Sequence, residues 1–443
     1  VKPRRRKQTM ATERDPEAAR QYGDESDEED EIFIDPDNDP DVVRKVYELE
    51  GQDMDEDEAS EAGDAEAGGG MALRPDGFGE GREEEDDEEP VVDLSAGRFE
   101  GHTDAVYSVA IHPTAPELIA TGSGDDTAAI WNRDSKQLLF RLAGHTDSVV
   151  SVAFNVAGTM LASAAMDGFV KLWNPADGTL LRTLEGPSED ITWISWHSKG
   201  DVLLAGSSDM SIWMWNAGTG DCMSVLSGHS GAVTCGKFNA DGKLVVSGSE
   251  DGSARVWSPK TGACVINLQD SKGAGTFHQA GLNCLDTCGD MLLTGSQDCT
   301  AILTMLTVPT TSDTLPTAKV LFIHQHHQDS VESVAIHPSM AYIATGSLDT
   351  RVMVYEASAE SPRFVCQHDA GVTKVLWHST KDWLLSSSLD RTVRVWDGRS
   401  GAALTSWTGH KDAVMDLVVS RDGLQCVSAS DDQCALLWAF PTA

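Results

Sequence analysis

The sequence predicts an all-β fold, an eight-bladed β-propeller that follows a long acidic N-terminal tail. Three observations carry this prediction. From residue 91 onward, one pattern recurs eight times at intervals of 41 to 49 residues. Each repeat contains short apolar stretches separated by Gly, Asp, Asn and Pro, which is typical of propeller blades with four strands each. Acidic residues, in contrast, concentrate before residue 91.

The tail comprises residues 1–90 and carries 33 Asp and Glu against 11 Lys and Arg. It includes the runs DESDEEDE at 24–31 and EEEDDEE at 83–89. Such a segment buries too little apolar surface to offset its ordering entropy, so we expect disorder. One exception is residues 31–50, EIFIDPDNDPDVVRKVYELE, where apolar residues recur at helical spacing. This segment is either a linear motif that folds onto a partner or a short helix against the protein's own surface.

The repeat of residues 91–443 begins with a His position. A Ser or Thr and an Asp follow, four residues apart, and a Trp stands six residues after the Asp. Five repeats fill all four positions: His102, Thr121, Asp125 and Trp131; His145, Ser163, Asp167 and Trp173; His229, Ser247, Asp251 and Trp257; His368, Ser386, Asp390 and Trp396; His410, Ser428, Asp432 and Trp438.

Three repeats depart from this pattern. The third has Pro187 and Ala205 in place of the His and the Ser or Thr, whereas Thr304 and Tyr355 replace the Trp of the fifth and sixth. We expect these blades to be less rigid or adapted to another role. In the third, packing of Trp193, Trp196, Trp213 and Trp215 is expected to substitute for the missing polar residues.

The two ends of the repeat region predict how the ring closes. After Trp438 only five residues remain, so the eighth repeat has three strands. Residues 91–99, VVDLSAGRF, read as a strand with no sheet of its own. We therefore expect strand 91–99 to complete the last blade, which would remove an open sheet edge.

His, Ser and Asp together also form the catalytic triad of hydrolases. Repetition argues against that role, because an active site occurs once whereas this set occurs in nearly every repeat. The sequence has no Gly-rich phosphate loop and no carboxylate pair placed as acid and base. An alternative is a zinc site formed by Cys284, Cys288, Cys299 and His278, but each of these residues occupies a strand or turn position of the repeat. We expect a non-catalytic protein without cofactor or metal.

Charge and composition narrow the partners. The net charge of −38 disfavours direct contact with nucleic acid or anionic lipid and favours a basic protein or peptide. No apolar run approaches the roughly 18 residues that span a membrane. Nine cysteines without metal-type pairs indicate reduced thiols in the cytoplasm. The KPRRRK run at 2–7 is either a nuclear localisation signal or solvated charge. We expect a monomer.

The Gly-His pairs at 101–102, 144–145, 228–229 and 409–410 and the Trp-Asp pair at 396–397 resemble WD-repeat proteins. The acidic tail, the eight repeats and the stretches at 193–222, 278–285, 330–338 and 366–377 resemble the angio-associated migratory cell protein family. The resemblance implies that each complete set of His, Ser or Thr, Asp and Trp is a buried hydrogen-bonded tetrad. It also implies a chaperone of a nascent, basic ribosomal protein in large-subunit assembly, because that family includes such an escort.

Two alternatives belong to other functional classes. In animals the family is tied to cell migration, which suggests a signalling scaffold. VWDGR at 395–399 matches the Trp-Asp-x-Arg pattern of substrate receptors of cullin-RING ubiquitin ligases.

When the four strands of a blade are lettered a to d in chain order, propellers usually bind partners on the face that carries the loops between strands d and a and between b and c. Three positions of each repeat point there: three and five residues after the His, and one before the Asp. They include four acidic and no basic residues, which favours a basic peptide, although such residues also occur on a solvated rim. The candidate partner-binding residues are Tyr107, Met166, Asp190, Glu250, Asn283, Glu332, Leu348, Leu389, Met415 and Asp431.

Overall fold

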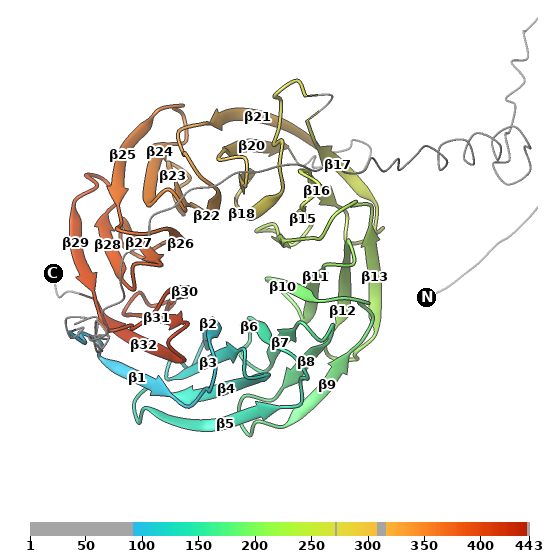
Figure 1. The fold of residues 1–443 in the computed structure, drawn as a ribbon. Coiled ribbons are helices and arrows are strands. Elements are labelled where there is room, and N and C mark those ends of the chain that lie inside the picture. Colours follow the sequence, from blue (N-terminus) through green and yellow to red (C-terminus); the bar gives the residue numbers. More distant parts are fainter. Residues whose placement is uncertain (1–91, 271–272, 308–315, 441–443) are drawn as a thin grey trace, which may run out of the picture. The chain divides into compact units, whose positions relative to one another are not determined.

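The computed structural model describes residues 92–270, 273–307 and 316–440 of the 443-residue chain. These residues form eight antiparallel sheets of four strands, arranged as blades around a central axis (Figure 1). The predicted all-β, eight-bladed propeller is therefore confirmed. The tail of residues 1–90, with the segment 31–50, lies outside the described residues.

The strands of each blade are called a to d from the axis outward. Blades one to four comprise β2 (Val106–Ile111), β3 (Leu118–Ser123), β4 (Thr127–Asn132) and β5 (Gln137–Ala143); β6 (Val149–Phe154), β7 (Leu161–Ala165), β8 (Val170–Trp173) and β9 (Leu180–Leu184); β10 (Ile191–Trp196), β11 (Val202–Ser207), β12 (Ser211–Asn216) and β13 (Cys222–Ser227); β14 (Cys235–Phe238), β15 (Val245–Gly248), β16 (Ala254–Trp257) and β17 (Cys264–Leu268). Blades five to eight comprise β18 (Leu282–Cys288), β19 (Met291–Ser296), β20 (Ala301–Thr307) and β21 (Thr317–His324); β22 (Val331–Ile336), β23 (Tyr342–Ser347), β24 (Arg351–Glu356) and β25 (Pro362–Gln367); β26 (Val372–Trp377), β27 (Trp383–Ser388), β28 (Val393–Asp397) and β29 (Ala403–Trp407); β30 (Val414–Val419), β31 (Gln425–Ser430), β32 (Cys434–Ala439) and β1 (Gly97–Glu100).

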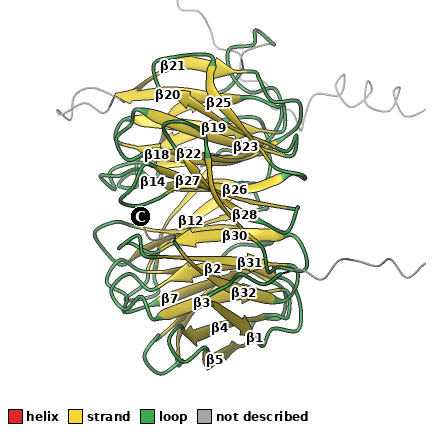
Figure 2. Ribbon diagram, turned by 90° about the vertical axis from the view of Figure 1, so that its left-hand side faces the viewer, coloured by secondary structure: helices red, strands yellow, loops and turns green. Residues whose placement is uncertain are grey.

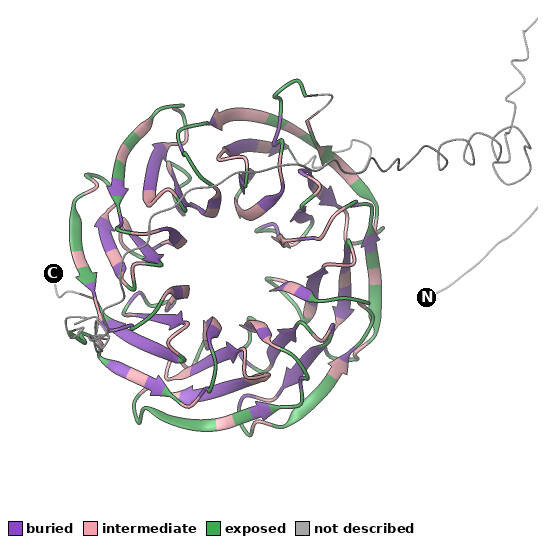
Figure 3. Cartoon of the chain, in the orientation of Figure 1, coloured by how far each residue is buried: buried purple, intermediate pink, exposed green. Residues whose placement is uncertain are grey.

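Antiparallel strands sort the connections onto two faces. The b–c turns and the d–a connections lie at one end of the strands, and the a–b and c–d turns lie at the other (Figure 2). We call the first the tetrad face, because it carries the His and Asp positions of the repeat, and the second the opposite face. Figure 3 shows that buried residues concentrate on the inner strands, whereas the outer d strands are largely exposed.

The eighth blade is completed from the N-terminal side of the propeller. β1 pairs antiparallel with β32, with Gly97 opposite Leu437 and Glu100 opposite Cys434. The strand is shorter than the predicted 91–99, because the Asp93 carboxylate accepts the Ser95 N–H at 2.8 Å and turns the chain before the pairing begins. Phe99 is buried against Trp131 of blade one, so the closing strand also joins the first blade.

Two carboxylates on innermost strands, the a strands of blades five and eight, each connect three blades. Asp286 of blade five accepts hydrogen bonds from Lys237 Nζ of blade four and from the Ile336 N–H of blade six, both at 2.7 Å. Asp416 of blade eight accepts one from Lys374 Nζ of blade seven at 2.7 Å. It also accepts the Val109 N–H of blade one at 2.9 Å. Four of the eight blade junctions are bridged in this way.

The remaining four junctions are bridged by neutral side chains. Ser108 and Ser333 accept the backbone N–H groups of Val152 and Val375 from the next blade, at 3.2 and 3.0 Å. In blade three two tryptophans are the donors. Trp196 Nε1 donates to the Ala153 carbonyl of blade two at 2.9 Å, and Trp193 Nε1 donates to the Val233 carbonyl before blade four at 3.0 Å. A side-chain hydrogen bond near the axis therefore spans every junction.

Candidate protein-binding face

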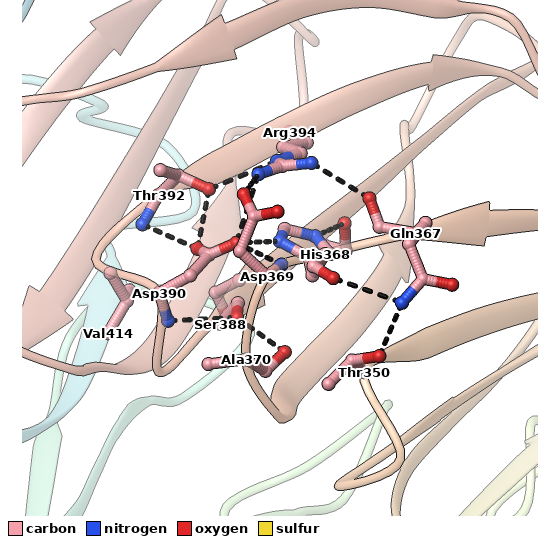
Figure 4. A network of polar contacts seen from close by, with 12 residues as sticks. Thr350, Gln367, His368, Asp369, Ala370, Ser388, Asp390, Thr392, Arg394 and Val414 are labelled. Atoms are coloured by element: carbon pink, nitrogen blue, oxygen red, sulfur yellow. Dashed lines mark hydrogen bonds and ion pairs between the residues drawn. The ribbon is translucent and has the colours of Figure 1, made fainter.

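The tetrad of blade seven shows how the repeated residues are used, and Figure 4 labels its His368 and Asp390. His368 Nδ1 donates to Asp390 at 2.8 Å, which leaves Nε2 to accept the Ser386 hydroxyl at 2.7 Å. Ser386 in turn accepts the indole N–H of Trp396 at 2.8 Å. Asp390 also accepts the backbone N–H groups of Asp369 and Thr392. The chain of bonds fixes the d–a connection against the b–c turn, and so shapes the surface above it.

The other four complete sets form the same chain of hydrogen bonds. In blades one, two, four and eight, the His–Asp distances are 2.9–3.0 Å and the Trp–Ser or Trp–Thr distances are 2.8 Å. The hydroxyl-bearing residues are completely buried: Thr121, Ser163, Ser247, Ser386 and Ser428. A buried hydroxyl that already accepts an indole N–H is not placed to attack a substrate, so the geometry suits a structural role.

Blades five and six keep three of the four members. His327 of blade six contacts Asp349 at 2.9 Å and Thr345 at 2.7 Å, and the Tyr355 hydroxyl contacts Met353 Sδ. In blade five, His278 contacts Thr294 at 2.8 Å and Asp298 at 3.4 Å, and the Thr304 hydroxyl is buried without a partner. His278 belongs to this network, and among the described residues no group of three or more His, Cys, Asp or Glu is placed to hold a metal ion.

Blade three replaces the tetrad by aromatic packing. The Trp213 and Trp215 rings stack with centroids 6.0 Å apart, and the Trp213 ring covers Gly186, where a Cβ atom would lie within 2.3 Å of it. Because Ala205 stands where other blades have a Ser or Thr, the buried Trp215 N–H has no hydrogen-bond acceptor. Asp209 still accepts the N–H groups of Ser188 and Ser211 and holds the turn.

Burial and hydrogen bonding lower the pKa values of three tetrad residues of blades one and two. Burial opposes ionisation of Asp125, but hydrogen bonds from Thr127 and His102 outweigh it, and the pKa of Asp125 falls to about 2. Burial lowers the pKa of His102 and of His145 despite their Asp partners. In blade one, an ionised carboxylate is therefore paired with an imidazole whose pKa is lowered, so that His102 stays neutral at pH 7.

The two faces of the ring differ strongly in charge. Among the described residues, the b–c turns and d–a connections of the tetrad face contain 20 Asp and Glu against two basic residues, Arg391 and Lys411. The described a–b and c–d turns of the opposite face contain 10 acidic and 8 basic residues. Acidic side chains are thus concentrated where the tetrads shape the loops.

A β-bulge explains why the fifth residue after the His position reaches this face. In seven blades the a–b pairing skips one residue, for example between Val106 and Ser108 and between Val331 and Ser333. The skipped residue is left out of the ladder and its side chain is re-aimed. Four candidate residues stand at such positions, and all four are half-buried: Tyr107, Asn283, Glu332 and Met415.

The remaining candidates lie in loops of the tetrad face. Five are exposed, namely Met166, Asp190, Glu250, Leu348 and Leu389, and Asp431 is half-buried. The structure brings together two pairs of candidates. Asn283 Nδ2 donates to Glu332 at 3.0 Å, and Leu348 and Leu389 both border Gly371. Of the other candidates, Met415 and Asp431 belong to blade eight, and the rest stand on blades one to four: Tyr107, Met166, Asp190 and Glu250.

Two acidic residues near Asp431 were not among the candidates. Burial and the negative charges of Asp412 and Asp104 raise the pKa of Asp431, so these three carboxylates lie close together between blades eight and one. Both Asp104 and Asp412 stand two residues after a tetrad His. Four of the eight repeats have Asp at this position, a signal that was visible in the sequence.

Comparison with known proteins places the chain in a family. The family described as WD domain, G-beta repeat matches residues 95–132, 136–174, 178–216, 220–258, 318–356, 360–397 and 401–439. Angio-associated migratory cell protein of Canis lupus familiaris is 34% identical over 353 residues, 77% of this chain and 79% of the relative. The chain belongs to the angio-associated migratory cell protein family. The predicted family resemblance is confirmed.

Similarity to proteins named for ribosome assembly is more limited. Ribosome assembly protein SQT1 of Saccharomyces cerevisiae is 39% identical over 87 residues, 18% of this chain and 20% of that protein. A crystal structure of Chaetomium thermophilum Sqt1 bound to the N-terminus of ribosomal protein L10 has a TM-score of 0.70 and 24% identity. It covers 79% of this chain and 100% of that chain, and the likeness shows a shared fold. In the described residues, no helix is long and apolar enough to cross a membrane.

Proposed function

We propose that this protein is a non-catalytic cytoplasmic escort that binds a basic segment of a large-subunit ribosomal protein on its tetrad face. The observation that carries the proposal is the charge contrast between the loops of the two faces, 20 acidic to 2 basic residues against 10 to 8. Six of the 20 are tetrad carboxylates whose side chains are at most 6% exposed, and without them the tetrad face still has 14 acidic to 2 basic residues. A surface of this kind attracts a basic segment and disfavours the phosphates of nucleic acid. The solved Sqt1 complex with the N-terminus of ribosomal protein L10 supports this class of client.

The geometry favours an extended client. Asp190, Glu250, Glu332 and Asp431 come from the connections or strands of blades three, four, six and eight. They surround the axis and do not form one patch, so a peptide with several Arg or Lys is needed to reach more than one of them. Each partly desolvated pair is worth about 1–2 kcal/mol.

The test is a double charge reversal, Glu332→Lys with Asp431→Lys, in the full chain. Calorimetric titration with a synthetic peptide of the L10 N-terminus should show an affinity roughly 30- to 1,000-fold below that of the unaltered chain. The matched control reverses the exposed Asp221 and Asp290 of the opposite face, and should leave affinity within about twofold. Unchanged affinity of the first variant with an intact fold would count against the proposal.

The ligase-receptor alternative places the partner elsewhere. Arg399 of the VWDGR motif lies on the opposite face with 73% of its side chain exposed, and its Nε donates to Asp382 at 2.8 Å. An adaptor that reads this motif should be lost in Arg399→Ala, whereas binding of the basic peptide should persist. Copurification of ligase subunits with the unaltered chain, but not with this variant, would favour the receptor role.

A further inference from the structure

A cavity of about 550 Å³ lies in the inner wall of the ring, along the a strands of blades four to seven. Thr234, Asn283 and Glu332 line it, and the latter two occupy the β-bulge positions of blades five and six. The cavity also contains Lys237 and Lys374. It is therefore mixed in charge, and its net preference depends on which of these groups are already paired.

The charges in the cavity do not cancel. Lys237 is paired with Asp286 at 2.7 Å, and Lys374 is paired with Asp416 at the same distance. Glu332 is the lining carboxylate that has no Lys, Arg or His partner among the described residues, since it accepts only the neutral Asn283 amide at 3.0 Å. Asn283 is itself held by Ser330 at 2.8 Å and by Gln297 at 3.2 Å. Glu332 is thus a half-buried carboxylate that is hydrogen-bonded to an immobilised amide and available to pair with a cation of a partner.

An apolar pair stands beside this carboxylate. Leu348 of blade six and Leu389 of blade seven are 37% and 40% exposed. Both approach Gly371, where an added Cβ atom would lie 2.8 Å from Leu348 Cδ2 and 3.3 Å from Leu389 Cδ1. Ser330 connects the two features, because its carbonyl accepts the Leu348 N–H at 3.0 Å and its hydroxyl accepts the Asn283 amide. The acidic tetrad face therefore has a small exposed apolar surface next to the cavity.

We propose that Glu332, Leu348 and Leu389 form a seat for one Arg or Lys side chain of the client, with its methylene stem over the leucines and its cationic end on Glu332. Arg and Lys side chains lie along apolar surface in this manner while the charge finds a polar partner. The seat rests on the proposed function, and it selects one residue of the client. The Asp104, Asp412 and Asp431 group differs, because three adjacent carboxylates attract any positive charge without an apolar surface for its stem.

The test is a double-mutant cycle across the interface. The protein variants are Glu332→Gln, which keeps the acceptor for Asn283, and Leu348→Ser with Leu389→Ser. The probes are L10 N-terminal peptides in which one Arg or Lys at a time is replaced by norleucine. We expect Glu332→Gln to lower the affinity for the unsubstituted peptide about 10- to 100-fold. The double leucine variant should lower it about 5- to 20-fold. One norleucine substitution, and no other, should weaken binding to the unaltered chain but leave the affinity for the Glu332→Gln variant unchanged.

The control is Asp190→Asn, an exposed carboxylate of the same face on blade three. Its effect should be smaller than that of Glu332→Gln, and should vanish at about 0.5 M salt, at which exposed charges are screened. If the unaltered chain binds no peptide, the proposed function fails. If it binds and every peptide substitution has the same effect in both chains, or if the leucine variant binds normally, the seat is refuted.

Discussion

Removal of one tetrad Asp should destabilise the protein more in blade four than in blade three. Asp251 and Asp209 are matched turn residues. Each accepts two backbone N–H groups and one Ser hydroxyl, those of Ser230 and Ser253 for Asp251 and of Ser188 and Ser211 for Asp209. Asp251 alone accepts a His, His229 Nδ1 at 3.0 Å. The difference between Asp251→Ala and Asp209→Ala therefore isolates one buried His–carboxylate bond.

The magnitude follows from that bond. A hydrogen bond to an ionised group contributes about 1.5–3 kcal/mol, and a buried donor without a partner costs about 1–3 kcal/mol. Ser253 Oγ lies 3.2 Å from His229 Nδ1 and would replace part of the loss. We therefore expect Asp251→Ala to lower the free energy of unfolding by about 1–2 kcal/mol more than Asp209→Ala.

Urea unfolding of the two full-length variants at pH 7.5, followed by Trp fluorescence and circular dichroism, measures this difference. The slope of free energy against urea should be unchanged if only stability is altered. Equal losses in the two blades would refute the reasoning, because they would show that the carboxylate acts only through the turn that both variants disrupt.

Three further predictions concern stability and kinetics. Acidification should lower the free energy of unfolding in two stages. Below about pH 6.5 an unfolded His binds protons before His102 does, and below about pH 4 an unfolded Asp binds them before Asp125, whose pKa is about 2. A free energy of unfolding that increases as the pH is lowered from 6.5 to 5 would contradict this prediction. Ala205→Ser should raise the free energy of unfolding by about 0.5–1 kcal/mol, because the added hydroxyl gives the Trp215 N–H an acceptor. A lower free energy of unfolding in urea denaturation would contradict this prediction. Deleting residues 1–90 should slow association with the basic peptide, most at low salt, with little change in dissociation by stopped flow; a many-fold faster dissociation would instead indicate a docking motif at 31–50.

Most of the fold could be predicted because one pattern recurs eight times, complete in five repeats and recognisable in the other three. The position of the closing strand was less accurate, because β1 spans only Gly97–Glu100 and the turn made by Asp93 and Ser95 is a local side-chain effect. Blade three was correctly expected to use its tryptophans. The partners of Trp193 and Trp196, however, are backbone carbonyls of other blades, and no sequence pattern marks a carbonyl.

The candidate face was only partly accessible to the same reasoning. Spacing within a repeat identified which residues reach the surface, because the β-bulge recurs at a fixed distance from the His. It did not indicate which of them meet. Asn283 and Glu332 are 49 residues apart, and Leu348 and Leu389 meet only through Gly371. Contacts between blades depend on the ring, which is absent from any single repeat.

The hydrogen bonds near the axis also bear on where the polypeptide can begin and end. Asp416 holds both sides of blade eight, which is assembled from the two ends of the propeller, and Asp286 holds both sides of blade five, which lacks the tetrad Trp. Asp416 thus fixes a blade that is assembled from the two ends of the propeller, and Asp286 fixes a blade whose tetrad is incomplete. A circularly permuted propeller should accordingly accept a break in blade five as readily as it accepts the meeting of its two ends in blade eight, since the surrounding junctions are bridged alike.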